Sequence, residues 1–133
     1  MDERRFPRSF ESLDGIFGLI AEFLRAEGLD AAHAFDLDLM AEELFTNMVK
    51  YGNGAEPIAI GIARDGDAVV LVLRDFGAPP WDVTRPRALP NAPIEQRRAG
   101  GLGLHLVQRL ADRLEYHHDG HSGTVTVRKR VAT

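Results

Sequence analysis

Glu43 and Asn47 form a pair of side chains whose types and spacing suit a chemical role. They stand four residues apart within an apolar repeat typical of a helix, so they share one helical face. Their oxygens suit Mg²⁺, and a carboxylate beside a phosphate can accept the proton of an attacking hydroxyl. Taken alone, the pair is better explained by a solvated glutamate and an asparagine near a helix end.

The stretch 99–107, "AGGLGLHLV", is a second candidate because its three glycines lead into a helical pattern. Gly100, Gly101 and Gly103 let the backbone approach a ligand, and the N-terminus of a helix attracts phosphate. The stretch lacks the Gly-Lys-Ser/Thr of a Walker A motif, and it follows an irregular loop, unlike a Rossmann fingerprint. A tight loop with a close helix–sheet contact explains it equally well.

Asp75 and Gly77 form the third candidate, at the end of a segment that is apolar on both faces. A carboxylate there can accept a hydrogen bond from an exocyclic amine such as that of adenine. Gly77 leaves room for a flat ring beside it. Aspartate and glycine are also ordinary turn residues, so by itself this motif predicts a turn.

Helices and strands must position these candidates. Apolar residues at three- and four-residue spacing predict helices over residues 12–28, 30–52 and 102–114, the first two ending at Gly28 and Gly52. Strands are expected at an edge over 4–8, in a hairpin formed by 57–63 and 68–74, and in a closing hairpin near Asp119-Gly120. Residues 83–99 show no periodicity and contain three prolines, which predicts a long functional or disordered loop. The fold class is α+β, with three helices on one face of a mostly antiparallel sheet.

The composition narrows the functional classes. The chain has 133 residues, 44% of them hydrophobic, which suits one compact domain over residues 1–133. Its net charge of -4, without a basic run, disfavours nucleic acid as a partner. The absence of cysteine excludes thiol catalysis and cysteine-bound zinc. Without an apolar signal core or a membrane-spanning run, a cytoplasmic location is expected.

The order of the three motifs carries more information than any one of them. A helix with Glu43 and Asn47, a strand ending in Asp75-x-Gly77, a proline-rich loop and a Gly-Gly-x-Gly helix start resemble the nucleotide-binding domain of the GHKL ATPases. Within that superfamily the chain is most similar to the anti-sigma factor serine/threonine-protein kinases, over residues 6–131. The resemblance implies the Bergerat fold, a two-layer α/β sandwich with a mixed, mostly antiparallel sheet and its helices on one face.

The resemblance also implies roles for individual residues. Glu43 matches the catalytic carboxylate that acts on the acceptor hydroxyl, and Asn47 matches the Mg²⁺ ligand. Asp75 matches the carboxylate that reads adenine. The ATP lid corresponds to residues 83–99. The small residue beside the ring and the phosphate-binding backbone correspond to Gly77, Gly100, Gly101, Leu102 and Gly103.

Several charged residues have less definite matches. The family's phosphate-contacting arginine falls on Arg97 or Arg98, and we select Arg98 for the cofactor site. Lys50 is either a phosphate contact or a solvated charge near the helix end. Trp81-Asp82 resembles an aromatic-acid pair at the base of the lid. The three histidines near the second hairpin are expected to be exposed turn residues, not metal ligands; they are His117, His118 and His121.

The function implied by the resemblance is that of an ATP- and Mg²⁺-dependent kinase. It would sequester a sigma factor and phosphorylate a serine or threonine of an antagonist (anti-anti-sigma) protein, and it would form homodimers through the N-terminal strand and first helix. Two alternatives stay open: a nucleotide-gated protein-binding module with little phosphotransfer, and an activator kinase in a partner-switching complex. A histidine kinase fragment is less expected, because no dimerisation helix or phosphoacceptor histidine precedes the domain.

Overall fold

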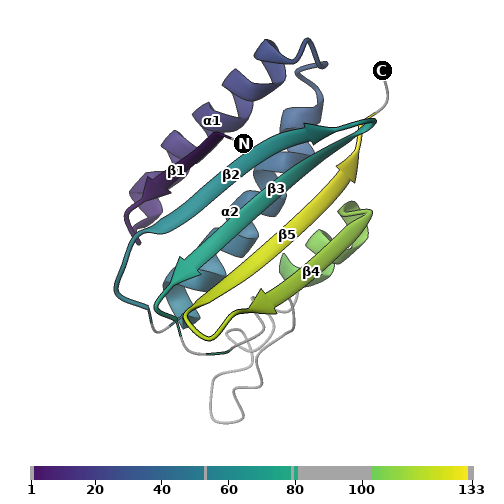
Figure 1. Ribbon diagram of the computed structural model, residues 1–133. Helices are drawn as coiled ribbons and strands as arrows, with labels where there is room; N and C mark the ends of the chain where they lie inside the picture. The colour runs from purple at the N-terminus through teal and green to yellow at the C-terminus, as the bar shows by residue number, and fades with distance from the viewer. Residues whose placement is uncertain (1, 53, 79, 81–102, 132–133) are drawn as a thin grey trace.

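The computed structural model describes residues 2–52, 54–78, 80 and 103–131. Two helices and a 3-10 turn precede most of the sheet, and a further helical segment, 103–110, lies between the third and fourth strands (Figure 1). The labelled elements are β1 (Asp2–Phe6), η1 (Phe10–Ser12), α1 (Leu13–Ala26), α2 (His33–Tyr51), β2 (Ile58–Asp65), β3 (Ala68–Phe76), β4 (Arg113–His118) and β5 (Ser122–Arg130).

The five strands form one sheet in the order β1-β2-β3-β5-β4. β1 is an edge strand and β3 lies between β2 and β5, as the sequence predicted for both. All four pairings are antiparallel, so the described strands contain none of the parallel pairs that a mixed sheet would have. The α+β class is confirmed, with α1, α2 and the segment 103–110 on one face of the sheet (Figure 1).

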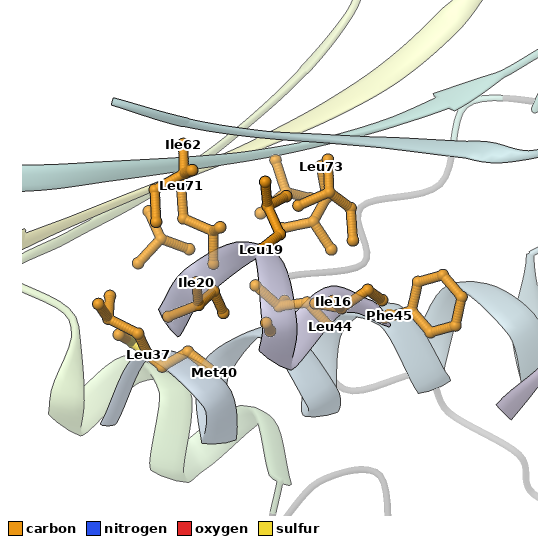
Figure 2. Close-up of a cluster of buried hydrophobic side chains, with 14 of the residues drawn as sticks. Ile16, Leu19, Ile20, Leu37, Met40, Leu44, Phe45, Ile62, Leu71 and Leu73 are labelled. Atoms are coloured by element: carbon orange, nitrogen blue, oxygen red, sulfur yellow. The ribbon is translucent and has the colours of Figure 1, made fainter. Parts of the chain in front are cut away.

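The core lies between the helices and the inward face of the sheet (Figure 2). The side chains of β2 point alternately to the two faces of the sheet. Ile58, Ile60 and Ile62 all point inward and are buried. They meet the apolar sides of α1 and α2, from which Ile20 and Leu44 are fully buried. Burial of this apolar area is the main force that holds the two layers together.

Two predicted turns are confirmed by glycines with positive φ. Gly28 has φ 67° just after the end of α1, and the Leu29 N–H donates back to the Leu24 carbonyl at 2.9 Å. Gly66 has φ 62° in the turn between β2 and β3. Only glycine adopts this conformation without a steric cost, which is why the sequence marks both positions.

The predicted third helix is too long at its C-terminal end. The described helical residues end at 110, and the Ala111 N–H closes the last turn on Val107. Asp112 then donates to the Arg128 carbonyl, which moves the chain into the sheet. Leu114 follows Leu110 at helical spacing, yet it pairs with Val127 of β5. None of the helices in the described parts of the chain is both long and apolar enough to cross a membrane.

Candidate functional site

The C-terminal half of α2 positions two of the predicted site residues. Glu43 is half-buried and Asn47 is only 5% exposed, although both are polar. They line one pocket of about 400 Å³, as their four-residue spacing predicted, and the other lining residues are Phe10, Leu13, Glu42, Thr46 and Lys50. A buried amide beside a half-buried carboxylate is unfavourable in an ordinary core and suits a ligand site.

Gly103 brings the glycine-rich stretch to this carboxylate. A Cβ atom built on Gly103 would overlap Glu43 Oε2 and would lie 2.7 Å from Glu43 Cδ. Glycine therefore lets the carboxylate take this position, and a larger residue would make the Glu43 side chain move. Gly103 is also the first described residue of the helical segment 103–110. A carboxylate and the backbone of this segment are thus neighbours, which suits a phosphate beside a proton acceptor.

The surroundings of Glu43 favour its protonated form. Burial raises the pKa of this carboxyl most, the charge of Glu42 raises it further, and Lys50 lowers it. A raised pKa brings a carboxylate closer to the range in which it exchanges protons at neutral pH. Lys50 is itself exposed, with its ammonium 5.9 Å from the centre of the Phe10 ring.

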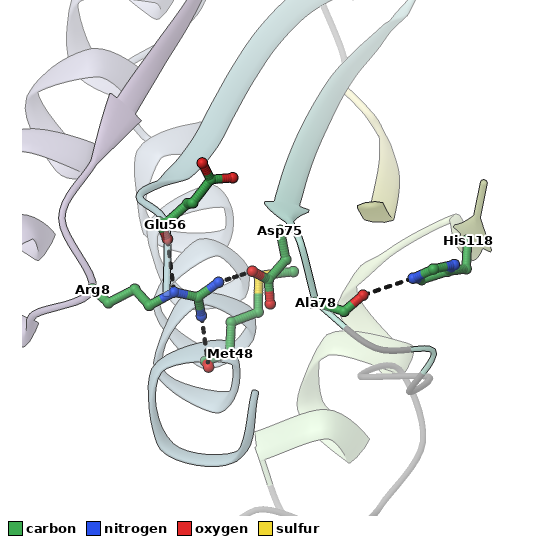
Figure 3. A network of polar contacts seen from close by, with 6 residues as sticks. All are labelled: Arg8, Met48, Glu56, Asp75, Ala78 and His118. Carbon is green, nitrogen blue, oxygen red and sulfur yellow. Dashed lines mark hydrogen bonds and ion pairs between the residues drawn. The ribbon is translucent and has the colours of Figure 1, made fainter. Parts of the chain in front are cut away.

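Asp75 is the last residue but one of β3 and points inward toward the end of α2, where it is 4% exposed. Its Oδ1 pairs with the guanidinium of Arg8, which also donates to the Glu56 and Met48 carbonyls at 2.7 and 3.3 Å (Figure 3). Burial lowers the pKa of Arg8, but an arginine keeps its charge in a protein. A Cβ on Gly52 would lie 3.1 Å from Asp75 Oδ2, so this carboxylate lies against the end of α2.

The β4–β5 turn holds the residues that follow Asp75. Gly77 has φ 71° and donates its N–H to the His121 carbonyl at 2.8 Å. His118 Nδ1 accepts from the Gly120 N–H at 3.0 Å, so Nε2 carries the hydrogen that is donated to the Ala78 carbonyl at 2.8 Å (Figure 3). Gly77 therefore belongs to a fixed turn, and among the described residues its Cβ position meets only the Glu56 carboxylate, at 3.8 Å.

The prediction of exposed turn histidines is correct for His121 alone. His117 is exposed but belongs to strand β4, and His118 is neither exposed nor in the turn. His118 belongs to β4, is half-buried and makes the two hydrogen bonds just described. The turn itself is ordered by Asp119, whose carboxylate accepts from the N–H groups of His121 and Ser122, and these bonds lower the pKa of Asp119.

The described residues offer a Mg²⁺ ion a small set of oxygen donors. Asn47 and Glu43 offer an amide oxygen and carboxylate oxygens in one pocket. Among the described residues no group of three or more His, Cys, Asp or Glu side chains could hold a metal ion. This donor set matches Mg²⁺, which takes one or two protein oxygens and completes its shell with phosphate and water.

Part of the predicted site lies outside the described residues: Arg97, Arg98, Gly100, Gly101, Leu102, Trp81-Asp82 and the lid 83–99. Conversely, no motif in the sequence pointed to Arg8, Gly54 or His118 as part of the site. Arg8 follows Pro7 after an edge strand, and Gly54 lies in what reads as a simple turn. No local pattern marks a residue whose partner is distant in the chain.

Comparisons with known proteins agree with this geometry. The family profile of the histidine kinase-like ATPase domain matches residues 6–129. The solved RsbU and RsbW domains of Rv1364c from Mycobacterium tuberculosis align with TM-score 0.70 and 17% identity, over 99% of this chain and 32% of theirs. This chain thus spans about a third of that protein chain. No similar sequence is found among curated proteins.

Two further structures share the fold. SiaB–SiaC from Pseudomonas aeruginosa aligns with TM-score 0.62 and 16% identity, over 96% of this chain and 88% of that one. The Acinetobacter baumannii histidine kinase AdeS aligns with TM-score 0.55 and 14% identity, over 100% and 69%. Identities this low show a common fold alone. Because the family profile covers nearly the whole length, the chain belongs to the histidine kinase-like ATPase domain family.

Proposed function

We propose that this protein is an ATP-dependent serine/threonine-protein kinase that acts as an anti-sigma factor. It would phosphorylate an antagonist protein and sequester a sigma factor. The observation that carries the proposal is the close approach of Gly103 to the Glu43 carboxylate, beside the buried Asn47. Support also comes from the family, and from two neighbours in fold, an RsbW domain and the SiaB–SiaC complex.

Each residue has a part in the proposed transfer. Asp75 accepts a hydrogen bond from the adenine amine, and the backbone at Gly103 binds phosphate oxygens. Asn47 holds Mg²⁺, which neutralises phosphate charge when bound. The acceptor hydroxyl attacks the γ-phosphorus and gives its proton to Glu43, while the bond to the β,γ-bridging oxygen breaks and ADP leaves. The half-buried carboxyl with its raised pKa suits that proton transfer.

Nucleotide binding is the first step to test. Calorimetry with Mg-ATP and Mg-ADP is expected to show saturable binding by the wild type and none or very weak binding by Asp75→Asn. Asp14→Asn, an exposed position in α1, is the matched control and should bind normally. Thermal melting of each variant establishes that it folds. A folded wild type that binds neither nucleotide contradicts the proposal.

Phosphotransfer is the second step. Co-purifying small proteins would be incubated with radiolabelled ATP and the kinase, and phosphoserine or phosphothreonine would be located by mass spectrometry. A labelled hydroxyl residue supports the kinase. Nucleotide binding without any transfer would instead favour a nucleotide-gated binding module, in which ATP only switches the affinity for a partner.

A further inference from the structure

Arg8 is a half-buried arginine that the proposed reaction does not use. Its side chain is 14% exposed, and it enters the site from the segment that follows β1. The guanidinium is held on three sides: Nε by the Glu56 carbonyl, Nη1 by the Met48 carbonyl and Nη2 by Asp75 (Figure 3). Such a fully engaged guanidinium has one orientation, unlike a solvated surface arginine.

The two atoms that join Arg8 to Asp75 have no other partner in the described part of the chain. Arg8 Nη2 and Asp75 Oδ1 are buried there, and neither has a hydrogen-bond partner apart from their mutual ion pair. A buried carboxyl without an opposite charge is driven toward its neutral form. A neutral carboxyl carries a hydrogen on one oxygen and can donate from it, whereas the ionised form only accepts. The presence of Arg8 thus decides whether Asp75 is an ionised acceptor or a neutral carboxyl group that can donate a hydrogen bond.

Two glycines provide the space for this pair. A Cβ on Gly54 would overlap Arg8 Nη2 and would lie 2.8 Å from Asp75 Oδ1. A Cβ on Gly52 would lie 3.1 Å from Asp75 Oδ2. The first glycine keeps Arg8 and Asp75 in contact, and the pair engages only Oδ1 of the carboxylate.

We propose that Arg8 is a positioning residue that sets nucleobase specificity: it holds Oδ1 of Asp75 and so keeps Oδ2 an acceptor for a 6-amino purine. A 6-oxo purine offers a carbonyl at that position, which an ionised carboxylate repels. The inference rests on the proposed nucleotide site at Asp75. The inference goes beyond the role of Asp75, because it assigns the selection of the nucleobase to Arg8, a residue on another segment.

The test compares Mg-ATP with Mg-ITP, in which a carbonyl replaces the 6-amino group. Calorimetry on the wild type should show a preference for ATP of at least about tenfold. In Arg8→Met we expect weaker ATP binding. The ratio of ATP affinity to ITP affinity should fall toward one, because a protonated Asp75 can donate to the 6-carbonyl of ITP. The lost preference should return in part as the pH is raised and Asp75 ionises. Arg8→Lys keeps the charge and should lie between the two.

Two further variants complete the experiment. Arg4→Met is the matched control, since Arg4 is exposed and pairs with Glu22 on the surface; its preference should equal that of the wild type. Gly54→Ala leaves both charges in place but forces Arg8 away from Asp75, so it should lower the preference as Arg8→Met does. If Arg8→Met does not fold in a thermal melt, Arg8→Lys and Gly54→Ala carry the test.

The outcomes separate the inference from the site on which it rests. If the wild type binds no ATP, or Asp75→Asn binds like the wild type, the nucleotide site is wrong. If Asp75→Asn fails to bind while the folded Arg8 and Gly54 variants keep the full preference for ATP, only the role of Arg8 is wrong. Tighter ATP binding by Arg8→Met also overturns it, because Arg8 would then obstruct the base. An equal loss of ATP and ITP affinity would show a merely structural role.

Discussion

Gly103 lies so close to Glu43 that a Cβ atom on Gly103 would overlap Oε2 of this carboxylate. The contact joins α2 to a segment far along the chain. In the proposed reaction it places the proton acceptor beside the backbone that binds phosphate. In phosphoryl transfer the protein contributes mainly position and charge, so this contact is a natural target for substitution.

Replacing Gly103 by alanine should damage transfer more than stability. The new methyl group overlaps the Glu43 carboxylate, which must move. Because the end of the glutamate side chain can rotate away, we expect a loss of only about 1 kcal/mol in the free energy of unfolding. We expect the transfer rate to fall about a hundredfold, because a displacement near 1 Å misaligns the proton acceptor. Chemical denaturation and a phosphotransfer assay measure the two effects.

Gly18→Ala is the matched control for that variant. Gly18 lies within α1, and nothing stands within 4 Å of its Cβ position. Alanine there should stabilise the helix by roughly 0.5–1 kcal/mol and leave transfer unchanged. If Gly103→Ala transferred phosphate like Gly18→Ala, the close contact would have no part in the reaction.

Glu43→Gln should abolish transfer while nucleotide binding persists. Glutamine has nearly the same shape but accepts no proton, so we expect the rate to fall about 10²–10⁴-fold. Calorimetry should show ATP affinity close to that of the wild type. Transfer at the normal rate would remove Glu43 from the catalytic role, and loss of ATP binding would make it a binding residue instead.

The pH dependence of transfer should report the surroundings of Glu43. Transfer requires the ionised carboxylate, so the rate falls as pH drops through its pKa, which burial and then Glu42 raise. Removing the negative charge in Glu42→Gln should move this acid limb to lower pH. Removing the positive charge in Lys50→Met should move it to higher pH, because Lys50 lowers the pKa. If the acid limb of the pH–rate profile stayed in place in both variants, the titrating group would be one other than Glu43.

His118→Ala should loosen the segment after Asp75. The variant loses the hydrogen bonds to the Ala78 carbonyl and from the Gly120 N–H, which should cost about 1–2 kcal/mol. Weaker ATP binding should accompany that loss. His117→Ala is the control, since the neighbouring side chain is exposed. Equal melting temperatures for the two variants would contradict the structural role of His118.

Asp38 gives a prediction for stability against pH. Its Oδ1 is buried and has no hydrogen-bond partner among the residues that the structure describes. Burial, followed by the charge of Glu42, raises its pKa to about 6. The folded state then binds a proton more tightly than the unfolded state. The stabilisation that Asp38 provides is full below its unfolded pKa of about 4 and is lost as pH rises through about 6.

Asp38→Asn should therefore be more stable than the wild type at pH 7.5, by about 1 kcal/mol once solvent screening is allowed for. The advantage should shrink at pH 5, where the folded wild type is largely protonated at this position. Urea unfolding at both pH values measures it. An advantage that is constant with pH would mean that the carboxyl does not titrate in this range.

The sequence by itself determined the local features of this protein. Helical spacing placed Glu43 and Asn47 on one face, and the structure gives them one pocket. Glycines marked the end of α1 and the β2–β3 turn, because only glycine adopts those backbone angles cheaply. The run of apolar residues identified β3 as an interior strand. The order of motifs was enough to indicate the family, which the profile match confirms.

Tertiary structure alone decided which distant residues meet. Arg8 reaches Asp75 because β1 pairs along β2 and so brings its end to the end of β3. Leu114 has helical spacing but joins β4, since pairing with β5 satisfies its backbone there. Local patterns reflect the preferences of a few adjacent residues, whereas these contacts depend on sheet register and on the packing of whole elements. No single stretch of sequence encodes either of them.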